Sequence, residues 1–206
     1  PMRRSQADEK AEELLRLVRI TNPAERLKVY PHELSGGMRQ RVCIAMALAN
    51  DAKVIIADEP TTALDVTVQA QILSLLDALR RESNAAILFI THDFGVVSAV
   101  CDRVAVMYAG RIVETGETEV VLARPAHPYT GKLIDCVPVL GQPGRRLDAI
   151  EGRPPVVNNL PAGCAFAARC ERAEADCREG DIPLAAFGEG RAVRCLHPLK
   201  GEAVDA

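Results

Sequence analysis

The amino-acid sequence predicts an α/β fold. Two short apolar runs, 53–57 and 86–90, have the length and composition of buried strands in a parallel sheet. A helix expected over 66–80 separates them, and this alternation of strand, helix and strand is typical of α/β layer architectures. The 206 residues are enough for one ordinary domain, or for most of one and a small appendage.

Further helices and a hairpin complete the expected elements. Apolar residues recur at helical spacing through 5–20 and predict an amphipathic helix. Ser35 is a good N-cap for a second helix, and Asp93 can cap a short one. The stretch 104–114 predicts a β-hairpin. The segment 138–161 is rich in proline and glycine and predicts a linker.

Composition restricts the partners of the chain. Hydrophobic residues make up 48% and charged residues 26%, which is normal for a soluble globular protein. Aromatic residues make up only 3%, so we expect an aliphatic core. The formal net charge of −3 gives no basic field, and no nucleic-acid partner is expected. No apolar run approaches the ~20 residues of a membrane span. We therefore expect any membrane association to go through a protein partner.

The segment 34–41, with the sequence LSGGMRQR, combines a helix N-cap with two glycines. A helix that begins here points unpaired backbone N–H groups forward, and its dipole favours an anion. Glycines at Gly36 and Gly37 let a phosphate approach the main chain, while Ser35 adds a hydroxyl and Gln40 an amide. For Ser-Gly-Gly alone, a capped helix with two flexible residues is the simpler interpretation.

Three further polar side chains follow the two expected strands. Asp58 ends the first apolar run and suits the Mg²⁺ shell of a bound nucleotide, through water. Glu59 can then polarise the attacking water as a general base. His92 follows the second strand and can hydrogen-bond a γ-phosphate. The structural alternatives are a capping turn for the acidic pair and a structural role for the histidine.

These motifs, taken in order, resemble those of an ABC-type ATPase. Segment 34–41 resembles the signature motif, Asp58-Glu59 the end of the Walker B strand, Ala63-Leu64-Asp65 the D-loop, and Thr91-His92-Asp93 the switch histidine. The resemblance implies that 1–116 is part of a P-loop NTPase nucleotide-binding domain with a helical signature subdomain. It also implies ATP and Mg²⁺ as ligands.

The resemblance further implies that ATP lies between two ATPase subunits. Ser35, Gly36, Gly37 and Gln40 would then serve the nucleotide held by the partner. Asp58, Glu59 and His92 would serve the nucleotide of their own subunit, and Asp65 would contact the partner. The glycine-rich Walker A loop of the family is not in the printed sequence. We therefore expect this chain alone to bind ATP weakly and to hydrolyse essentially none.

Two segments indicate one branch of this family. Tyr30-Pro31-His32-Glu33 before the signature and His127-Pro128-Tyr129-Thr130 after the hairpin resemble the ATPases of bacterial dipeptide, oligopeptide and nickel importers. The resemblance implies an importer-type C-terminal extension over 117–206. It implies a second, non-identical ABC ATPase subunit as partner, membrane permease subunits, and indirectly a solute-binding protein. The chain would then lie at the cytoplasmic face of the cell membrane as a peripheral subunit.

Four of the seven cysteines lie close to the C-terminus, separated by five, six and seventeen residues: Cys164, Cys170, Cys177 and Cys195. Zinc ribbons usually pair cysteines two to four residues apart, which these spacings do not match. Four thiolates can instead hold a [4Fe–4S] cluster, as the resemblance implies. Zinc ranks second and free thiols third, and disulfides are disfavoured in a reducing cytosol. His197 is a possible substitute ligand.

Two other functions remain open at this point. One is a soluble, non-transport ABC ATPase of DNA repair or translation, which would not be expected to carry the His-Pro-Tyr segment or the cysteine-rich end. The other is a non-catalytic interaction module that keeps the signature helix and the metal domain. The sequence does not distinguish dipeptides, longer peptides and nickel as the transported solute.

Overall fold

The computed structural model divides the chain into two compact units, 1–92 and 93–206. It describes residues 3–50, 52–62, 64–83, 85–137, 149–156, 158–188 and 190–199. The part 138–148 of the expected linker lies outside the described residues. None of the described helices has the length and apolar composition that a membrane span requires.

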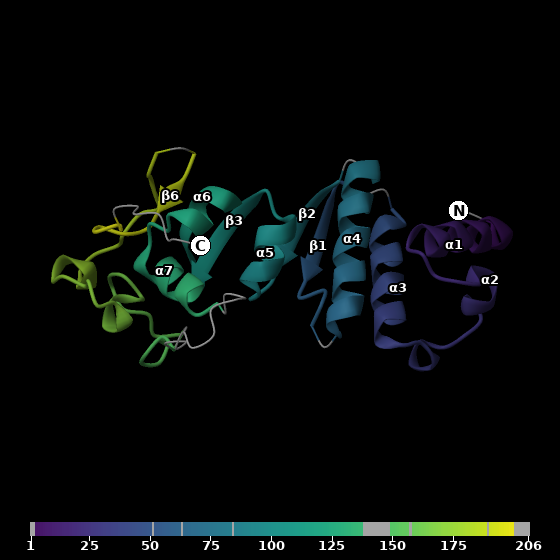
Figure 1. Ribbon diagram of the computed structural model, residues 1–206, viewed down its shortest axis with the longest axis horizontal. Coiled ribbons are helices and arrows are strands. Elements are labelled where there is room, and N and C mark those ends of the chain that lie inside the picture. Colours follow the sequence, from purple (N-terminus) through teal and green to yellow (C-terminus); the bar gives the residue numbers. More distant parts are fainter. Residues whose placement is uncertain are drawn as a thin grey trace. The chain divides into compact units, whose positions relative to one another are not determined.

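The first unit contains helices and one pair of strands (Figure 1). In chain order the elements are α1 (Arg4–Leu17), α2 (Pro23–Arg26), the 3-10 turn η1 (Pro31–Glu33), α3 (Gly36–Leu48), β1 (Val54–Asp58), α4 (Val66–Ser83) and β2 (Ala86–Ile90). Strands β1 and β2 pair in parallel, from Val54 opposite Ala86 to Asp58 opposite Ile90. The crossover α4 joins them, so the expected α/β unit is confirmed.

Helices α1, α3 and α4 form the core of this unit. Ile72 and Leu75 of α4 are fully buried, and Val18 at the end of α1 packs into the same cluster. Figure 1 shows α4 lying between α3 and the two strands. Ile87 and Phe89 of β2 pack against the helical cluster. This core is aliphatic except for Phe89, as the composition predicts.

The sheet of this unit is buried on one face only, which corrects the expectation of strands buried on both faces. Along β1, Ile55 and Ala57 are buried, but Ile56 is 66% exposed. Leu88 of β2 is 54% exposed. The physical reason is that the helical core covers one side of the strand pair, while no described element covers the alternate residues.

The second unit combines a short sheet with small helices and turns. Its elements are α5 (Phe94–Val100), β3 (Arg103–Tyr108), β4 (Arg111–Glu117), α6 (Thr118–Ala123), α7 (Pro128–Asp135), the 3-10 turns η2 (Ala167–Arg169) and η3 (Asp176–Arg178), β5 (Ala185–Ala186) and β6 (Ala192–Val193). Asp93 caps α5 as expected, accepting from the N–H groups of Gly95 and Val96. The β3–β4 hairpin is also confirmed. Its turn residues Ala109 and Gly110 both have positive φ, which suits the right-handed twist of the strands.

The C-terminal segment joins the hairpin in one sheet of order β3-β4-β6-β5. Glu114 and Thr115 of β4 pair with Val193 and Ala192 of β6. Beside this sheet Tyr108, Tyr129 and Phe166 pack ring against ring, with 4.6 Å between the centroids of the two tyrosines. An entirely aliphatic core is therefore wrong for this unit, because most of its few aromatic side chains gather at one place.

Candidate functional site

The carboxyl ends of β1 and β2 bring two predicted site residues into contact. The backbone N–H of Glu59 donates to the carbonyl oxygen of Ile90, at 2.9 Å, and so ties the residue after β1 to the end of β2. His92 lies two residues beyond that bond, and its Nδ1 is 3.1 Å from Oε1 of Glu59. Asp58 is the last residue of β1 and is exposed. The three side chains thus belong to one edge of the sheet, as parallel pairing requires.

Glu59 is held in position by its neighbours. Its backbone is left-handed, with φ of 43°, a conformation that is uncommon for residues other than glycine. The Thr62 hydroxyl donates to Oε2 of Glu59 at 2.8 Å. This hydrogen bond, and then that of His92, lowers the pKa of the Glu59 carboxyl below its usual value. Glu59 is therefore ionised at neutral pH and can accept a proton or a hydrogen bond from water.

The second predicted site is the start of α3, where Ser35 is the N-cap. The Met38 N–H donates to Ser35 Oγ at 3.3 Å, and Gly36 and Gly37 form the first turn. Gln40 follows on the same helix and is half-buried. The neighbours nearest to the two glycines are Leu64 and Val68, not the carboxyl ends of β1 and β2. The structure therefore does not join this group to Glu59 and His92.

Asp65 caps the neighbouring helix. Its carboxylate accepts the N–H of Val68 at 2.9 Å, in the first turn of α4. This contact gives Asp65 a structural role as a helix cap, and contact with a partner subunit stays a prediction. The beginnings of α3 and α4 consequently lie together, because Val68 also packs against Gly37.

Replacement of Gly37 by alanine is expected to destabilise the chain by about 1–3 kcal/mol through overpacking. A Cβ there would lie 2.7 Å from Cγ1 of Val68, a β-branched side chain that cannot swing away. Gly36→Ala is the matched control, because its Cβ would be 3.5 Å from Leu64 Cδ2, an ordinary contact. Urea unfolding of both variants checks this. Equal midpoints for the two would contradict the close packing of α3 on α4.

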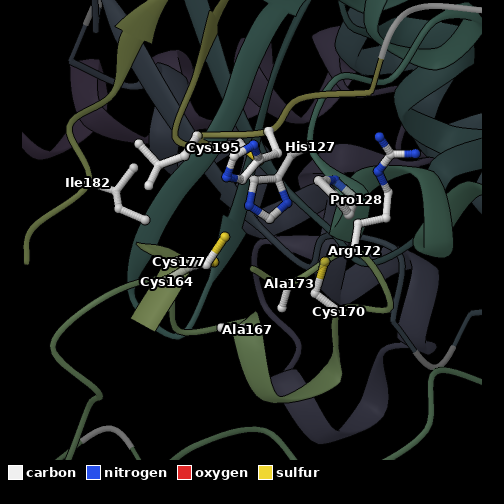
Figure 2. Close-up of a pocket in the computed structure, with 12 residues that line it drawn as sticks. His127, Pro128, Cys164, Ala167, Cys170, Arg172, Ala173, Cys177, Ile182 and Cys195 are labelled. Atoms are coloured by element: carbon white, nitrogen blue, oxygen red, sulfur yellow. The ribbon is translucent and has the colours of Figure 1, made fainter. Parts of the chain in front are cut away.

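The four C-terminal cysteines line one pocket (Figure 2). Cys164 and Cys177 come from segments tied together by a backbone hydrogen bond, in which Cys164 N–H donates to the Cys177 carbonyl at 2.8 Å. Burial raises the pKa of the Cys164 thiol, and it raises the pKa of Cys195 to about 11. Without a bound cation, these two thiols therefore keep their protons at neutral pH.

Two histidines lie on the wall of the same pocket. His127 is 1% exposed and caps α7, with its Nδ1 accepting the N–H of Tyr129 at 3.0 Å. Burial lowers the pKa of His127 to about 4, so the ring is neutral. His197 Nε2 lies 2.9 Å from a carboxylate oxygen of Asp176, whose hydrogen bond raises the pKa of His197. Nothing in the sequence indicates that His127 or Asp176 lies beside the cysteines.

The chain is similar to known ATP-binding proteins of ABC transporters. Residues 2–62 match the family model described as "ABC transporter", and residues 113–177 match "Oligopeptide/dipeptide transporter, C-terminal region". The oligopeptide transport ATP-binding protein OppD of Salmonella typhimurium is 50% identical over 199 residues, which cover 97% of this chain and 59% of that protein. The chain thus spans about three fifths of the length of this curated relative.

Solved structures of ABC proteins are also similar. A metal-chelate type ABC transporter in an inward-facing conformation has a TM-score of 0.55 and 29% identity, over 65% of this chain and 50% of that one. A dimeric bacterial ABC transporter cassette has a TM-score of 0.50 and 31% identity, over 57% of this chain and 50% of that one.

Taken together, the parallel strand pair with its acidic end, the glycine-led helix and these similarities define an ABC-type ATP-binding protein. Within that class, residues 113–177 match the C-terminal region of oligopeptide/dipeptide transporters, and the chain is similar over nearly its whole length to an oligopeptide transport ATP-binding protein. The ligands of this class are ATP and Mg²⁺.

Proposed function

We propose that the protein is the ATP-hydrolysing subunit of an importer that takes up peptides, or nickel, across the cytoplasmic membrane. The observation that carries the proposal is the Glu59–His92 contact at the carboxyl ends of two parallel strands, in a chain 50% identical to an oligopeptide transport ATP-binding protein. A non-transport ABC ATPase is not favoured, because the match to the transporter-type C-terminal region covers residues 113–177.

The residues at the sheet edge divide the chemistry between them. Asp58 offers exposed carboxylate oxygens, which would hold Mg²⁺ through water. When bound, Mg²⁺ neutralises charge on the β- and γ-phosphate oxygens. Glu59, ionised and held by the Thr62 hydroxyl, orients the attacking water and accepts its proton. Because the ionised Glu59 carboxylate only accepts, Nδ1–H of His92 donates to it, and His92 would donate to a γ-phosphate from its other ring nitrogen only as the doubly protonated ring.

The start of α3 would act on a second ATP-binding subunit. The nucleotide held by a related, non-identical ATPase would be faced by Ser35, Gly36, Gly37 and Gln40. Asp65 would lie at the interface between the two ATPase subunits. The exposed first turn of α3 has the open backbone N–H groups that a phosphate requires. The similarity to a dimeric ABC cassette supports a paired arrangement.

The remaining partners follow from the family. The two ATPase subunits would dock on membrane permease subunits at the cytoplasmic face of the inner membrane, as a peripheral assembly. A solute-binding protein would deliver the solute to the permease. The ATPase domain would comprise 1–116 and the importer-type extension 117–206. This division stays a prediction, and β4 and β6 place parts of both in one sheet.

A chimera tests the transport function. The region of Salmonella OppD that matches this chain is replaced by residues 3–199 of this chain, in cells that lack their own OppD. Restored oligopeptide uptake is expected, because the ATP-facing and permease-facing residues of that region are then those of this chain. A chimera that accumulates to normal levels, assembles on the membrane and supports no uptake would overturn the proposal.

We also propose that Cys164, Cys170, Cys177 and Cys195 hold a [4Fe–4S] cluster, with zinc as the second choice. Around zinc, four sulfurs at about 2.3 Å from the ion lie within about 4 Å of one another. Among the described residues, the group with ligand atoms within 4.8 Å of one another is Asp176, Cys177 and His197, and no three of the four thiols are that close. Thiols spread around one pocket suit a larger group.

Such a cluster would fasten segments that have little core of their own. Its presence is checked by iron and acid-labile sulfide in the full chain purified without oxygen, together with a brown colour. One zinc ion per chain, without iron, would reject the cluster and favour the second choice.

Metal affinity is expected to rise steeply with pH. Thiolates bind metals, while the raised pKa of Cys164 and the pKa of Cys195 near 11 keep two thiols protonated without metal. Releasing at least these two protons gives on the order of a 100-fold or greater gain in affinity per pH unit between about pH 6 and pH 8. Titration of the metal-stripped chain with zinc as a probe ion, against a chelator of known pH dependence, measures this. An affinity that does not change between about pH 6 and pH 8 would contradict a thiolate site.

A further inference from the structure

We propose that His127 donates an Nε2–H hydrogen bond to a sulfur atom of the metal centre in the cysteine pocket, and so acts as a positioning residue for that centre. The inference rests on the proposed metal centre and deepens it. The sequence gives His127 no role at a site, whereas the structure directs its ring into the pocket (Figure 2).

The protonation of the His127 ring follows from its helix-capping contact. Nδ1 accepts the backbone N–H of Tyr129 at 3.0 Å, so Nδ1 carries no proton. A neutral imidazole has one N–H, which must therefore be on Nε2. The doubly protonated ring would set Nδ1–H against the Tyr129 N–H, so this contact excludes that form.

The Nε2–H group is buried without a partner among the described residues. Leaving such a donor unpaired is costly, so an acceptor is expected within reach. Figure 2 shows the ring projecting into the same pocket as Cys164, Cys170 and Cys177. Of the other polar side chains on the wall, Arg172 only donates, and both ring nitrogens of His197 lie beside carboxylates, Nε2 at 2.9 Å from Asp176 and Nδ1 at 3.7 Å from Glu174.

Sulfur is therefore the acceptor that the pocket provides. A neutral thiol accepts weakly, but a metal-bound thiolate or an inorganic sulfide carries negative charge and accepts well. A hydrogen bond from Nε2–H would relieve the unpaired donor only when the centre is loaded. Loading would thereby be linked to the capped start of α7, through the Tyr129 bond on the opposite side of the ring.

Direct ligation by His127 does not fit the same geometry. A neutral histidine that binds metal through Nε2 carries its proton on Nδ1 and donates it to an acceptor. Here Nδ1 faces the Tyr129 N–H, a donor. His127 is consequently a donor toward the centre and not a fifth ligand.

Two substitutions separate the functions of the two ring nitrogens. His127→Asn keeps an amide oxygen that can accept the Tyr129 N–H, but it removes the donor at the position of Nε2. His127→Gln places an amide N–H near the position of Nε2 and gives up the helix cap. Both variants and the wild-type full chain are purified without oxygen. Metal content, metal loss to a chelator and midpoint potential are then measured.

His127→Asn is expected to bind the same amount of metal but to lose it about 10-fold faster, since outer-shell partners contribute on this scale. If the centre is a cluster, its midpoint potential should fall by about 59 mV, which is a tenfold change for a one-electron couple. The potential falls because the lost hydrogen bond stabilised the more negative, reduced state. His127→Gln should stay close to the wild type in both measurements.

The outcomes separate this inference from the proposal on which it rests. A wild-type chain without metal overturns both. A metal-loaded chain in which His127→Asn matches the wild type overturns the inference alone. Zinc in place of iron rejects the cluster, and the chelator comparison then decides for His127. A measurement without any variant uses ¹⁵N-histidine-labelled protein, in which a protonated Nδ1 at His127 would overturn the inference.

Discussion

Replacement of Arg191 by methionine is expected to destabilise the unit 93–206 by about 3–5 kcal/mol, because it leaves the buried carboxylate of Glu114 without its partner charge. Glu114 is fully buried and Arg191 is 7% exposed, and Nη2 of Arg191 lies 2.7 Å from Oε1 of Glu114. Without the guanidinium, the Glu114 charge would be buried with no opposite charge beside it in the described part of this unit.

The pair is part of a larger network of hydrogen bonds. The two carboxylate oxygens of Glu114 accept the backbone N–H groups of Ala126 and His127, each at 2.8 Å. Arg191 also donates to the carbonyl oxygen of Arg124 at 2.7 Å. Strand β4, the segment before α7 and the C-terminal segment are thus held at one point. Loss of Arg191 should disturb all three.

The measurement is urea unfolding followed by the near-ultraviolet circular dichroism of tyrosine, since Tyr108 and Tyr129 belong to the core of this unit. Arg111→Met is the control, because it breaks an exposed ion pair with Asp181 and should cost less than about 1 kcal/mol. Similar losses for Arg111→Met and Arg191→Met would contradict the buried-pair account.

The elements of the first unit could be predicted because their signals are local. Helical spacing of apolar residues marks α1, the Ser35 cap marks α3, and two apolar runs on either side of a helix mark β1 and β2. The convergence of Glu59 and His92 also follows from local information, since side chains after parallel strands meet at one sheet edge.

Other features depend on contacts that no local pattern records. Arg191 and Glu114 are 77 residues apart, and β6 consists of two residues with no strand signal of their own. The left-handed backbone of Glu59 has no marker in the sequence, because glycine would be the usual residue there. Thr62 could have been found, since a hydroxyl three residues after an acidic residue in a turn is a common partner.

The cysteine pocket has some features that the sequence predicts and others that it does not. The sequence groups four cysteines near the C-terminus, and these four line one pocket. Their spacings, however, do not say which other side chains share that pocket. His127 enters through the fold of α7 against the C-terminal segment, and its buried Nε2 becomes visible only once the packing around it is known.

Glu59→Gln, introduced into the OppD chimera, is expected to lower ATP hydrolysis by about 10²–10⁴-fold, the range that a general base contributes. Glutamine keeps the size and the contact with Thr62, but it has no negative charge and cannot take a proton from water. Glu59 is ionised at neutral pH, and its hydrogen bonds with Thr62 and His92 lower its pKa below the ordinary value. ATP hydrolysis by the purified assembly, with ATP binding measured separately, checks the effect.

Thr62→Ala distinguishes the base from its support. Removing the hydroxyl raises the pKa of Glu59 toward its ordinary value, because the Thr62 hydrogen bond is the largest cause of the lowering. Activity needs the ionised carboxylate and is lost as pH falls through that pKa, so the acid side of the pH profile should move to higher pH. At neutral pH Thr62→Ala should retain much more activity than Glu59→Gln. If Glu59→Gln binds ATP normally and hydrolyses it at the unmodified rate, the base must be another residue, and the contact with His92 would be structural.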